Sequence, residues 1–457
     1  MPTFLKKSLQ WASTFKTFIY LNPNEIEYPH EPFSHVLAVG EKRKVCSNTA
    51  HKIEGKTSFD KLYNFWNSQS QTENSYLFGY FNYDLKNELE NLSSSNLDNL
   101  GFPEFYFFEP KYILFFDTKG NLLIDKTKQE NNFEDEILSQ LIIEIENTEV
   151  ESNKSIYNST QPLSVSPPTT KNTSKPKINC HFSEKEYLQT VEIIKNHIVE
   201  GDVYELNLCI EFFIEKLELN PLEAYQELCK ISKMPFSSFL KITIEENEKK
   251  TEKYALCASP ERFLKKTGNR LISQPIKGTV KRGKTEDEDE EHKNYLKTSE
   301  KERAENMMIV DLVRNDLARS AEIGSTHVSE MFGIYTFQQV HQMISTVEAT
   351  LSKDKNWSEA IKNAFPMGSM TGAPKIKATQ LIEKYEKSKR GLYSGSIGYI
   401  SPNGDFDFNV VIRTLFYDSL SKYASFQVGG AITYDSDPKS EWEECLLKAK
   451  AIRSLFE

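Results

Sequence analysis

The stretch GLYSGSIGYISPNGDFDFNVVIRTLFYD, residues 391–418, carries the pattern that decides the fold. Apolar and polar residues alternate on both sides of its central PNGD turn, which predicts a β-hairpin. Similar strand signals occur at residues 75–85, 105–125 and 423–435, and the second of these is split by the turn TKGN. Because the strands come as hairpins and not in alternation with helices, the sequence favours an α+β fold with antiparallel sheets.

Helices are expected between and after the strands of the second half. Residues 183–202 have apolar residues at helical spacing behind a capping box of Ser183 and Glu186. Residues 293–322 predict one or two helices, and residues 438–457 predict a closing helix. The second half of the chain therefore mixes both element types.

A polar segment divides the chain. Residues 147–180 are rich in Ser, Thr, Asn and Pro and have almost no apolar periodicity, which is typical of a flexible linker or loop. The segment separates a β-rich N-terminal part of the fold, residues 1–146, from a second region, residues 181–457. The candidate chemistry lies in that second region.

The composition argues against several classes of protein. The 457 residues carry a formal net charge of -10, which disfavours a nucleic-acid partner. No apolar run approaches the roughly 20 residues of a membrane helix, and the first residues do not resemble a secretory signal. The six cysteines are scattered without a C-x-x-C pair, as expected for free thiols in a reducing cytoplasm.

Three glutamates could bind a metal ion. Glu441 and Glu444 lie one turn apart on the predicted closing helix, and Lys448 shares their face. Two such glutamates can supply ligands to a hard cation such as magnesium, although a solvated charged stripe has the same spacing. Glu305 begins a helix that becomes strongly apolar, so it is either a first-turn residue favoured by the helix dipole or a further ligand.

A second group of residues suggests acid–base and nucleophilic chemistry. Glu261 ends an apolar strand, where burial would raise its pKa so that it could donate a proton. Lys277 lies in SQPIKGTVKRG, residues 273–283, an expected apolar turn in which an uncharged amine could be a nucleophile. The spacing leaves open that the two form only a salt bridge. Arg413 stands in an apolar strand and requires a carboxylate from the protein or from a substrate.

The glycine turn GSMTGAPK, residues 368–375, precedes a predicted amphipathic helix. Its glycines lack the spacing of a phosphate-binding P-loop. Backbone amides at such a helix start can nevertheless hold a carboxylate.

Taken in order, these motifs resemble the chorismate-utilising enzymes. This family includes component I of anthranilate synthase, component I of aminodeoxychorismate synthase, and the isochorismate and salicylate synthases. The resemblance covers about residues 183–456. It is weak before them, where FGYFNYDL is the main matching segment. Its segments are GDVYELN, SPERF, PIKGT, AENMMIVDLVRNDLAR, FPMGSMTGAPK, RGLYSGSIGY, VIRT, GGAIT and SDPKSEWEECLLKA. The resemblance implies an intertwined α+β fold of two packed antiparallel β-sheets with helices outside, chorismate as substrate and Mg2+ as cofactor.

The resemblance also assigns roles by motif. Glu261 would be the general acid for the leaving hydroxyl. Magnesium, held by Glu305, Glu441 and Glu444, would bind the ring carboxylate of chorismate. The implied substrate contacts are Gly278, Thr279, Thr371, Gly372, Tyr393, Arg413, Gly429, Gly430, Ala431 and Lys448.

Lys277 discriminates between members of the family. Anthranilate, isochorismate and salicylate synthases typically carry Ala in this slot, whereas the aminodeoxychorismate type carries Lys. A lysine can add to the ring carbon ortho to the carboxylate and expel the hydroxyl, assisted by Glu261. Ammonia then attacks the vacated carbon and expels the lysine, so that two easier steps replace one. The implied product is 4-amino-4-deoxychorismate, a precursor of 4-aminobenzoate and folate.

Three residues depart from the family pattern. Glu205 stands where aminating members usually have Gln and water-adding members have Lys, and it could orient ammonia or pair with a cation. Gln342 stands where a ring-contacting His is common, and the adjacent His341 would point elsewhere on a helix. Ala431 replaces a third Gly, which requires a negative φ at that position.

The ammonia must come from another source. No cysteine has the G-x-C-x-G motif of a glutamine amidotransferase, so we expect a separate glutaminase subunit. The N-terminal part lacks the LLES element of tryptophan feedback, which favours the folate branch, although a structural tryptophan and the oligomeric state stay open. The alternatives are component I of anthranilate synthase and an inactive scaffold subunit. A scaffold has no need for Lys277 and Glu261 together with three glutamates.

Overall fold

The computed structural model describes most of the chain. It covers residues 2–47, 56–68, 75–90, 92–150, 156–158, 175–246 and 249–457. The helices are α1 (Thr3–Ala12), α2 (Ser58–Asn67), α3 (Lys86–Leu89), α4 (Ile124–Asn131), α5 (Asp135–Glu146), α6 (Glu184–Val199), α7 (Pro221–Ile231), α8 (Glu286–Thr298), α9 (Glu300–Ala318), α10 (Trp357–Ala364), α11 (Lys375–Tyr385) and α12 (Pro438–Arg453), with the 3-10 helices η1 (Tyr83–Leu85) and η2 (Gly368–Met370).

The strands are short to medium in length. They are β1 (Phe18–Asn22), β2 (Val36–Cys46), β3 (Leu77–Phe81), β4 (Phe105–Phe115), β5 (Tyr157–Asn158), β6 (Asn179–Cys180), β7 (Glu205–Ile214), β8 (Glu218–Leu219), β9 (Phe236–Glu246), β10 (Lys249–Ser259), β11 (Arg262–Thr267), β12 (Arg270–Gln274), β13 (Ile276–Lys281), β14 (His327–Thr336), β15 (Val340–Thr350), β16 (Gly372–Ala373), β17 (Ser396–Ile400), β18 (Phe406–Asn409), β19 (Thr414–Asp418) and β20 (Tyr423–Ile432).

These strands pair antiparallel and form two connected halves. One half follows the order β7–β20–β19–β10–β9–β1. The other follows β2–β4–β3–β17–β18–β11–β12–β15–β14, and the pairing of β1 with β2 joins the halves. The N-terminal strands β1, β2, β4 and β3 therefore lie next to one another in the middle of this order, flanked on both sides by strands of the second region.

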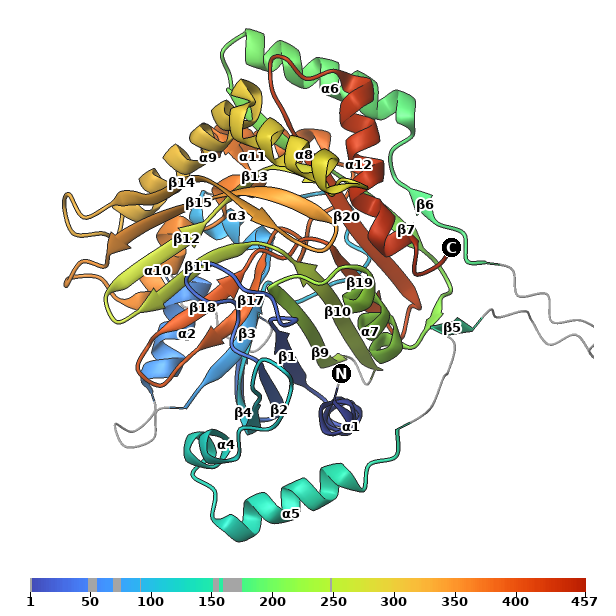
Figure 1. Cartoon of the computed structure of the whole chain (residues 1–457), viewed down its shortest axis with the longest axis vertical. Coiled ribbons are helices and arrows are strands. Elements are labelled where there is room, and N and C mark those ends of the chain that lie inside the picture. Colours follow the sequence, from blue (N-terminus) through green and yellow to red (C-terminus); the bar gives the residue numbers. More distant parts are fainter. Residues whose placement is uncertain are drawn as a thin grey trace, which may run out of the picture.

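The two halves face each other across a shared core. This core contains Leu240 and Phe416 from the first half and Phe107 and Phe408 from the second. A second core lies between the first half and helices α6, α7 and α12. Successive residues of β1 alternate between the two cores, as the period of a strand requires. The α+β class with antiparallel sheets and outer helices is confirmed, and Figure 1 shows α6, α9 and α12 along one side of the strands.

The stretch 391–418 forms the predicted hairpin but ends it early. Strands β17 and β18 pair around the PNGD turn. Residues 410–413 then leave the sheet, so the prediction that Arg413 lies in a strand is wrong. The physical reason is a crossing: β18 pairs with β11 in one half, whereas β19 pairs with β10 in the other. Arg413 makes this crossing with a φ of 52°.

Two other predicted elements differ in detail. The signal at 293–322 belongs to two helices, and α8 already begins with the acidic run at Glu286. After the TKGN turn, the strand expected to return is reduced to one bridge between Phe116 and Leu122. Helix α6, in contrast, begins at Glu184 with the predicted capping box of Ser183 and Glu186.

Much of the predicted linker, residues 151–155 and 159–174, lies outside the described residues. Its described parts include β5, which pairs with β8, and β6, which pairs with β7. None of the six cysteines forms a disulfide. Among the described helices, none combines the length and the apolar character that crossing a bilayer would demand.

Candidate active site

Lys277 lies at an irregularity of β13 rather than in the expected turn. Between Ile276 and Thr279, β13 has one residue more than the facing segment of β15. Gly278 takes a φ of 90° within this bulge, a left-handed conformation that suits glycine. Bulges re-aim side chains, and the Lys277 side chain is only 13% exposed, with Nζ 4.0 Å from Oε2 of Glu205. The amine therefore faces the protein interior and not bulk solvent.

Helix α9 holds the backbone of Lys277. Asn306 Nδ2 donates a hydrogen bond of 3.3 Å to the Lys277 carbonyl. Ser345 Oγ in turn donates to Asn306 Oδ1 at 2.6 Å. Because Asn306 is buried, this contact fixes the bulge. Asn306 was not among the predicted site residues, although it lies within the AENMM part of a family segment.

Glu261 lies in the connection between β10 and β11 and is 5% exposed. Burial raises its pKa to about 7, against a hydrogen bond from Ser369 and the positive charges of Lys277 and Arg413. The Ser369 hydroxyl donates to Oε1 at 2.6 Å, a contact that the sequence did not predict. Glu261 and Lys277 do not form an ion pair in the described structure, so a simple salt bridge does not account for them.

Arg413 is a cation with open donors. Among the described residues, its guanidinium has no ion pair, and its one hydrogen-bond contact is 3.7 Å from Nη1 to the sulfur of Met234. Burial lowers the pKa of Arg413 to about 10, although the nearby Glu261 opposes this effect. The guanidinium is therefore available to a carboxylate of a ligand.

The predicted metal ligands gather between α9 and α12. A Cβ on Gly430 would lie 3.1 Å from Glu441 Oε2 and 3.9 Å from Glu444 Oε1. Burial raises the pKa of Glu441, and Glu444 adds to this effect against a hydrogen bond from Ser436. Glu305 lies in the second turn of α9, so the first-turn explanation does not apply to it.

Two unpredicted residues of α9 belong to the same group. Burial and the neighbouring Glu305 raise the pKa of Glu302. Against the effect of burial, four glutamates raise the pKa of Lys301; they are Glu305, Glu441, Glu302 and Glu444. Carboxylate oxygens that repel one another in this way are suitable ligands for a divalent cation. Only the i, i+4 spacing of Lys301 and Glu305 could have indicated this lysine from the sequence.

Lys448 and the glycine pair form one edge of this group. Lys448 Nζ lies 2.7 Å from Glu444 Oε1 and donates to the Gly429 carbonyl at 2.8 Å. A Cβ on Gly429 would approach a backbone oxygen to 2.6 Å, so the position requires glycine. Ala431 lies within β20, opposite Asn207, and its φ is not positive. An alanine can therefore replace the third glycine of the family pattern at this position without backbone strain.

Three other predicted contacts are buried in the framework. The Thr371 hydroxyl donates to two carbonyls of the preceding turn at 3.2 Å. Gly372 has a φ of 152°, and a Cβ there would lie 2.3 Å from the Glu205 carbonyl oxygen. The Tyr393 hydroxyl lies 3.9 Å from the sulfur of Cys209. These residues support the strand that carries Glu205, since Gly372 belongs to β16, which pairs with β7.

Thr279 and Gln342 pair across β13 and β15. Gln342 Nε2 donates to the Thr279 hydroxyl at 3.4 Å, and Gln342 Oε1 is buried without a partner among the described residues. His341 lies on a strand and not on the expected helix. It still points away from Gln342, because neighbours on a strand face opposite sides, and it contacts Asp289 at 2.9 Å.

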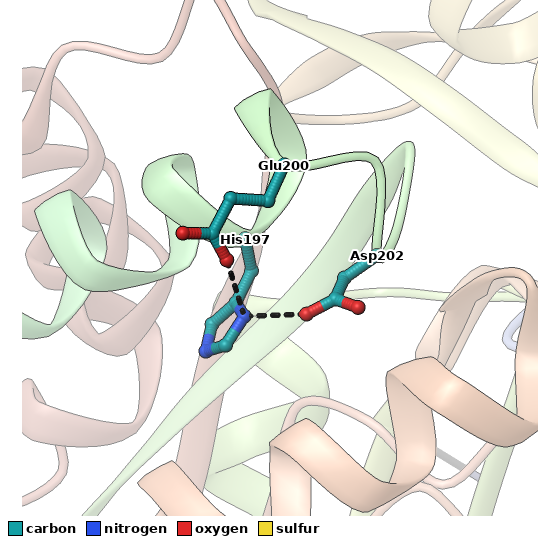
Figure 2. A group of neighbouring side chains, drawn as sticks. All are labelled: His197, Glu200 and Asp202. Carbon is teal, nitrogen blue, oxygen red and sulfur yellow. Dashed lines mark hydrogen bonds and ion pairs between the residues drawn. The ribbon is translucent and has the colours of Figure 1, made fainter.

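Figure 2 shows a different cluster, formed by His197, Glu200 and Asp202 at the end of α6. Within the described residues, it is the group of possible metal ligands whose atoms lie within 4.8 Å of one another. Both ring nitrogens are already engaged, by Asp202 at 2.7 Å and by the Tyr385 hydroxyl at 2.8 Å. Asp202 also pairs with Lys377 at 3.0 Å. These contacts tie α6 to α11 and account for the cluster without a metal.

Comparisons with known proteins agree with this arrangement. The chain is 32% identical over 409 residues to aminodeoxychorismate synthase component 1 of Bacillus subtilis (strain 168), covering 87% of this chain and 82% of that protein. It is 41% identical over 276 residues to the probable chloroplastic aminodeoxychorismate synthase of Oryza sativa subsp. japonica, covering 60% of this chain. That match spans only 30% of the rice protein, and a match to the Arabidopsis thaliana enzyme spans 28% of its length.

Solved structures show the same fold. Anthranilate synthase component I from Streptococcus pneumoniae TIGR4 superposes with a TM-score of 0.74 and 25% identity, and the match covers 93% of each chain. The menaquinone-specific isochorismate synthase MenF from Escherichia coli gives a TM-score of 0.70 at 15% identity. The profile of the family described as chorismate binding enzyme matches residues 16–454. This match includes both the N-terminal strands and the site, and the chain therefore belongs to the chorismate-binding enzyme family.

Proposed function

We propose that this chain is an aminodeoxychorismate synthase component I, which converts chorismate and ammonia to 4-amino-4-deoxychorismate. The observation that carries the proposal is Lys277, a largely buried amine on a bulged strand beside Glu205 and within the field of Glu261. Relatives named aminodeoxychorismate synthase at 32% and 41% identity support the same product.

The first proposed step forms a bond between Lys277 and the substrate. The neutral Lys277 amine attacks the ring carbon ortho to the carboxylate, the double bond shifts, and the ring hydroxyl leaves. Glu261 gives this hydroxyl its proton, so that water departs. A pKa of about 7 suits that task because Glu261 can still hold a proton near neutral pH. Ser369 orients the carboxyl group through its hydrogen bond of 2.6 Å.

The second proposed step releases the lysine. Ammonia attacks the carbon that lost the hydroxyl, the double bond returns, and the bond to Lys277 breaks. The electron pair of that bond returns to the lysine nitrogen, which leaves as a neutral amine. The amino group ends para to the carboxylate because ammonia bonds to the carbon that carried the hydroxyl, and the ortho carbon regains its double bond.

The charged residues around the site would bind the substrate dianion. Arg413 contacts only the sulfur of Met234 among the described residues, whereas Lys448 pairs with Glu444. Both cations would attract the substrate's carboxylates. Mg2+, held by Glu305, Glu441 and Glu444, would neutralise the ring carboxylate when bound. The four-glutamate group fits such an ion by its oxygen chemistry and its mutual repulsion.

The proposal is tested by identifying the product. The protein is incubated with chorismate, magnesium and ammonium chloride, and the products are identified by mass. We expect aminodeoxychorismate from the wild type and at least about a hundredfold less from Lys277→Ala. Lys281→Ala, an exposed lysine on the same strand, is the control and should retain activity.

Other products would contradict the proposal. Anthranilate, which fluoresces, would indicate component I of anthranilate synthase, the name of a solved Streptococcus pneumoniae structure with the same fold. Chorismate left unchanged under these conditions would indicate an inactive scaffold. We further propose that a separate glutaminase subunit supplies the ammonia, and glutamine alone should then give no product with this chain.

A further inference from the structure

Asn306 is a buried amide that bonds to two strands at once. It is 1% exposed and lies on the face of α9 that packs against β13 and β15, and Figure 1 shows this helix beside those strands. Its Nδ2 donates to the Lys277 carbonyl at 3.3 Å and to the Met343 carbonyl at 3.5 Å. An amide nitrogen carries two hydrogens, so it can serve both carbonyls. With both hydrogens engaged, the buried side chain has a fixed orientation.

The two carbonyls belong to the irregular part of the sheet. Lys277 and Gly278 of β13 both lie opposite Met343 of β15. An extra residue of this kind disrupts the hydrogen bonds of the ladder, and the Asn306 amide donates to carbonyls on both sides of the irregularity. A Cβ on Gly278 would lie 3.0 Å from Oε2 of Glu302, one turn before Asn306. Helix α9 therefore contacts the bulge at two successive turns.

A second hydrogen bond holds Asn306 itself. Ser345 Oγ donates to Asn306 Oδ1 at 2.6 Å and accepts from the backbone N–H of Phe332 at 3.1 Å. Phe332 lies where the register of β14 against β15 shifts, and its φ is 62°. The side chains of Asn306 and Ser345 are both buried. One network of buried polar groups therefore joins the irregular part of β14 to the backbone of Lys277.

Asn306 also follows directly on a predicted metal ligand. Glu305 belongs to the glutamate group between α9 and α12, and its Oε1 lies 3.9 Å from Lys301 Nζ. Neighbouring residues of a helix point about 100° apart. One side of α9 therefore carries Glu305 toward the other glutamates, and the adjacent side carries Asn306 toward the strands. A single helical turn links the predicted metal site to the bulge.

We propose that Asn306 is a positioning residue that sets the distance between the Lys277 amine and the metal-binding glutamates. This inference rests on the proposed function and deepens it. The lysine must bond to the ring carbon ortho to the carboxylate that Mg2+ would hold when bound. Reactions between two held groups tolerate little error in spacing, and a displacement of about 1 Å can lower a rate by about a hundredfold. The link through α9 fixes this spacing before the substrate binds.

The test compares Asn306→Leu with wild type, because leucine has a similar size but donates no hydrogen bond. We expect kcat and kcat/KM for chorismate to fall together by about a hundredfold, so that the KM changes less than about threefold. The magnesium concentration that gives half of the thermal stabilisation should also change less than about threefold, since Glu305, Glu441 and Glu444 are retained. In the metal-free protein, hydrogen exchange across residues 276–281 should be faster than in wild type.

A second variant covers the case in which Asn306→Leu does not fold. Ser345→Ala keeps both donors of Asn306 but removes the group that orients its amide. We expect the same pattern with a smaller fall in kcat, of about tenfold. The same criteria then apply to this variant.

Asn131→Leu is the matched control. Asn131 of α4 donates to the Ile113 carbonyl of β4 at 2.7 Å and accepts from the Ile113 N–H at 2.9 Å. This is also a link from a helix to a strand backbone, but it lies in the N-terminal part of the fold. The substitution should lower the unfolding temperature and leave kcat unchanged.

Two outcomes would overturn the inference. One is a kcat of the folded variant within about threefold of wild type. The other is a rise in the KM for chorismate and in the half-saturating magnesium concentration that matches the fall in kcat. Either result would make Asn306 a part of the framework only. Failure of the wild type to make aminodeoxychorismate would instead contradict the proposed function.

Discussion

Arg390 and Arg413 are two arginines with opposite surroundings. Arg390 donates to both carboxylate oxygens of Glu386, at 2.7 and 3.0 Å, and to the carbonyl of Asn207 at 2.8 Å. Arg413 has no ion pair with a described residue and contacts the sulfur of Met234. Complete pairing makes Arg390 part of the framework, whereas the open donors of Arg413 suit an anionic ligand.

The carboxylates of the two regions differ in the same way. Glu386 accepts from Arg390 and from the backbone of Cys209 at 2.8 Å. Glu205 has an oxygen that accepts no hydrogen bond from any described residue, and burial raises the pKa of Glu261 to about 7. The site therefore contains charged groups that lack partners among the described residues, whereas the charged groups of the surrounding framework are paired. This difference predicts that equivalent substitutions act on stability in one region and on activity in the other.

The largest effect is expected from Arg390→Met. The loss of the arginine leaves the Glu386 carboxylate buried without a cation, which lowers the unfolding free energy by about 3–5 kcal/mol. Arg413→Met removes a half-buried charge that has no ion pair with a described residue, so it should not lower the unfolding free energy. It should instead raise the KM for chorismate at least about tenfold. Urea unfolding and steady-state kinetics measure the two effects, and equal destabilisation by both variants would contradict the comparison.

The next effect concerns Glu261→Gln and depends on pH. The pKa of Glu261 is raised from its usual value of 4.5 to about 7. Between these values the folded state holds more protons than the unfolded state, so wild-type stability falls as pH rises. The amide does not titrate, and we expect the variant to be more stable than wild type by about 3 kcal/mol above about pH 7. The difference should vanish below about pH 4.

The same variant should lose activity. Without a proton on residue 261, the hydroxyl leaves unassisted, and general acids contribute about 10²–10⁴-fold to rates. Wild-type turnover should fall as pH rises through about 7, because Glu261 loses its proton. If the variant were as active as wild type, or if its stability followed the wild-type pH profile, Glu261 would not be the general acid.

The sequence predicted the fold class because local signals and long-range structure agree in most strands. The PNGD turn and the capping box of Ser183 act within a few residues, and both formed as predicted. Arg413 and Lys277 were misplaced locally because their conformations come from distant strands. The crossing at Arg413 depends on the pairing of β19 with β10, and the bulge at Lys277 depends on its register with β15.

The contents of the site were also only partly predictable. Motif spacing identified Glu261, Glu305 and Glu441, but Ser369 and Asn306 act through contacts across 108 and 29 positions of the chain. Short polar residues at such separations have no periodicity that marks them. The unsatisfied oxygen of Glu205 is likewise visible only when every possible donor has a position.

A smaller effect is expected from Glu441→Gln. Burial and Glu444 raise the pKa of Glu441, so removing its charge relieves repulsion in the metal-free protein. We expect a gain of about 0.5–1 kcal/mol without metal and a reduced stabilisation by Mg2+. Thermal unfolding with and without MgCl2 measures both. Glu443→Gln, a neighbouring exposed glutamate, is the control. If Mg2+ stabilises Glu441→Gln as much as wild type, Glu441 is not a ligand.

The smallest effect is expected from Ala431→Gly, the change toward the family pattern. Ala431 lies inside β20 opposite Asn207 with an ordinary strand backbone, so glycine adds only freedom to the unfolded chain. The expected cost is about 0.5–1 kcal/mol, with the KM for chorismate unchanged. Gly429→Ala is the contrasting variant on the same strand, because the added Cβ would lie 2.6 Å from a backbone oxygen. If Ala431→Gly improved chorismate binding more than about twofold, the methyl group would obstruct the substrate, and the backbone of this strand would approach the ligand more closely than proposed.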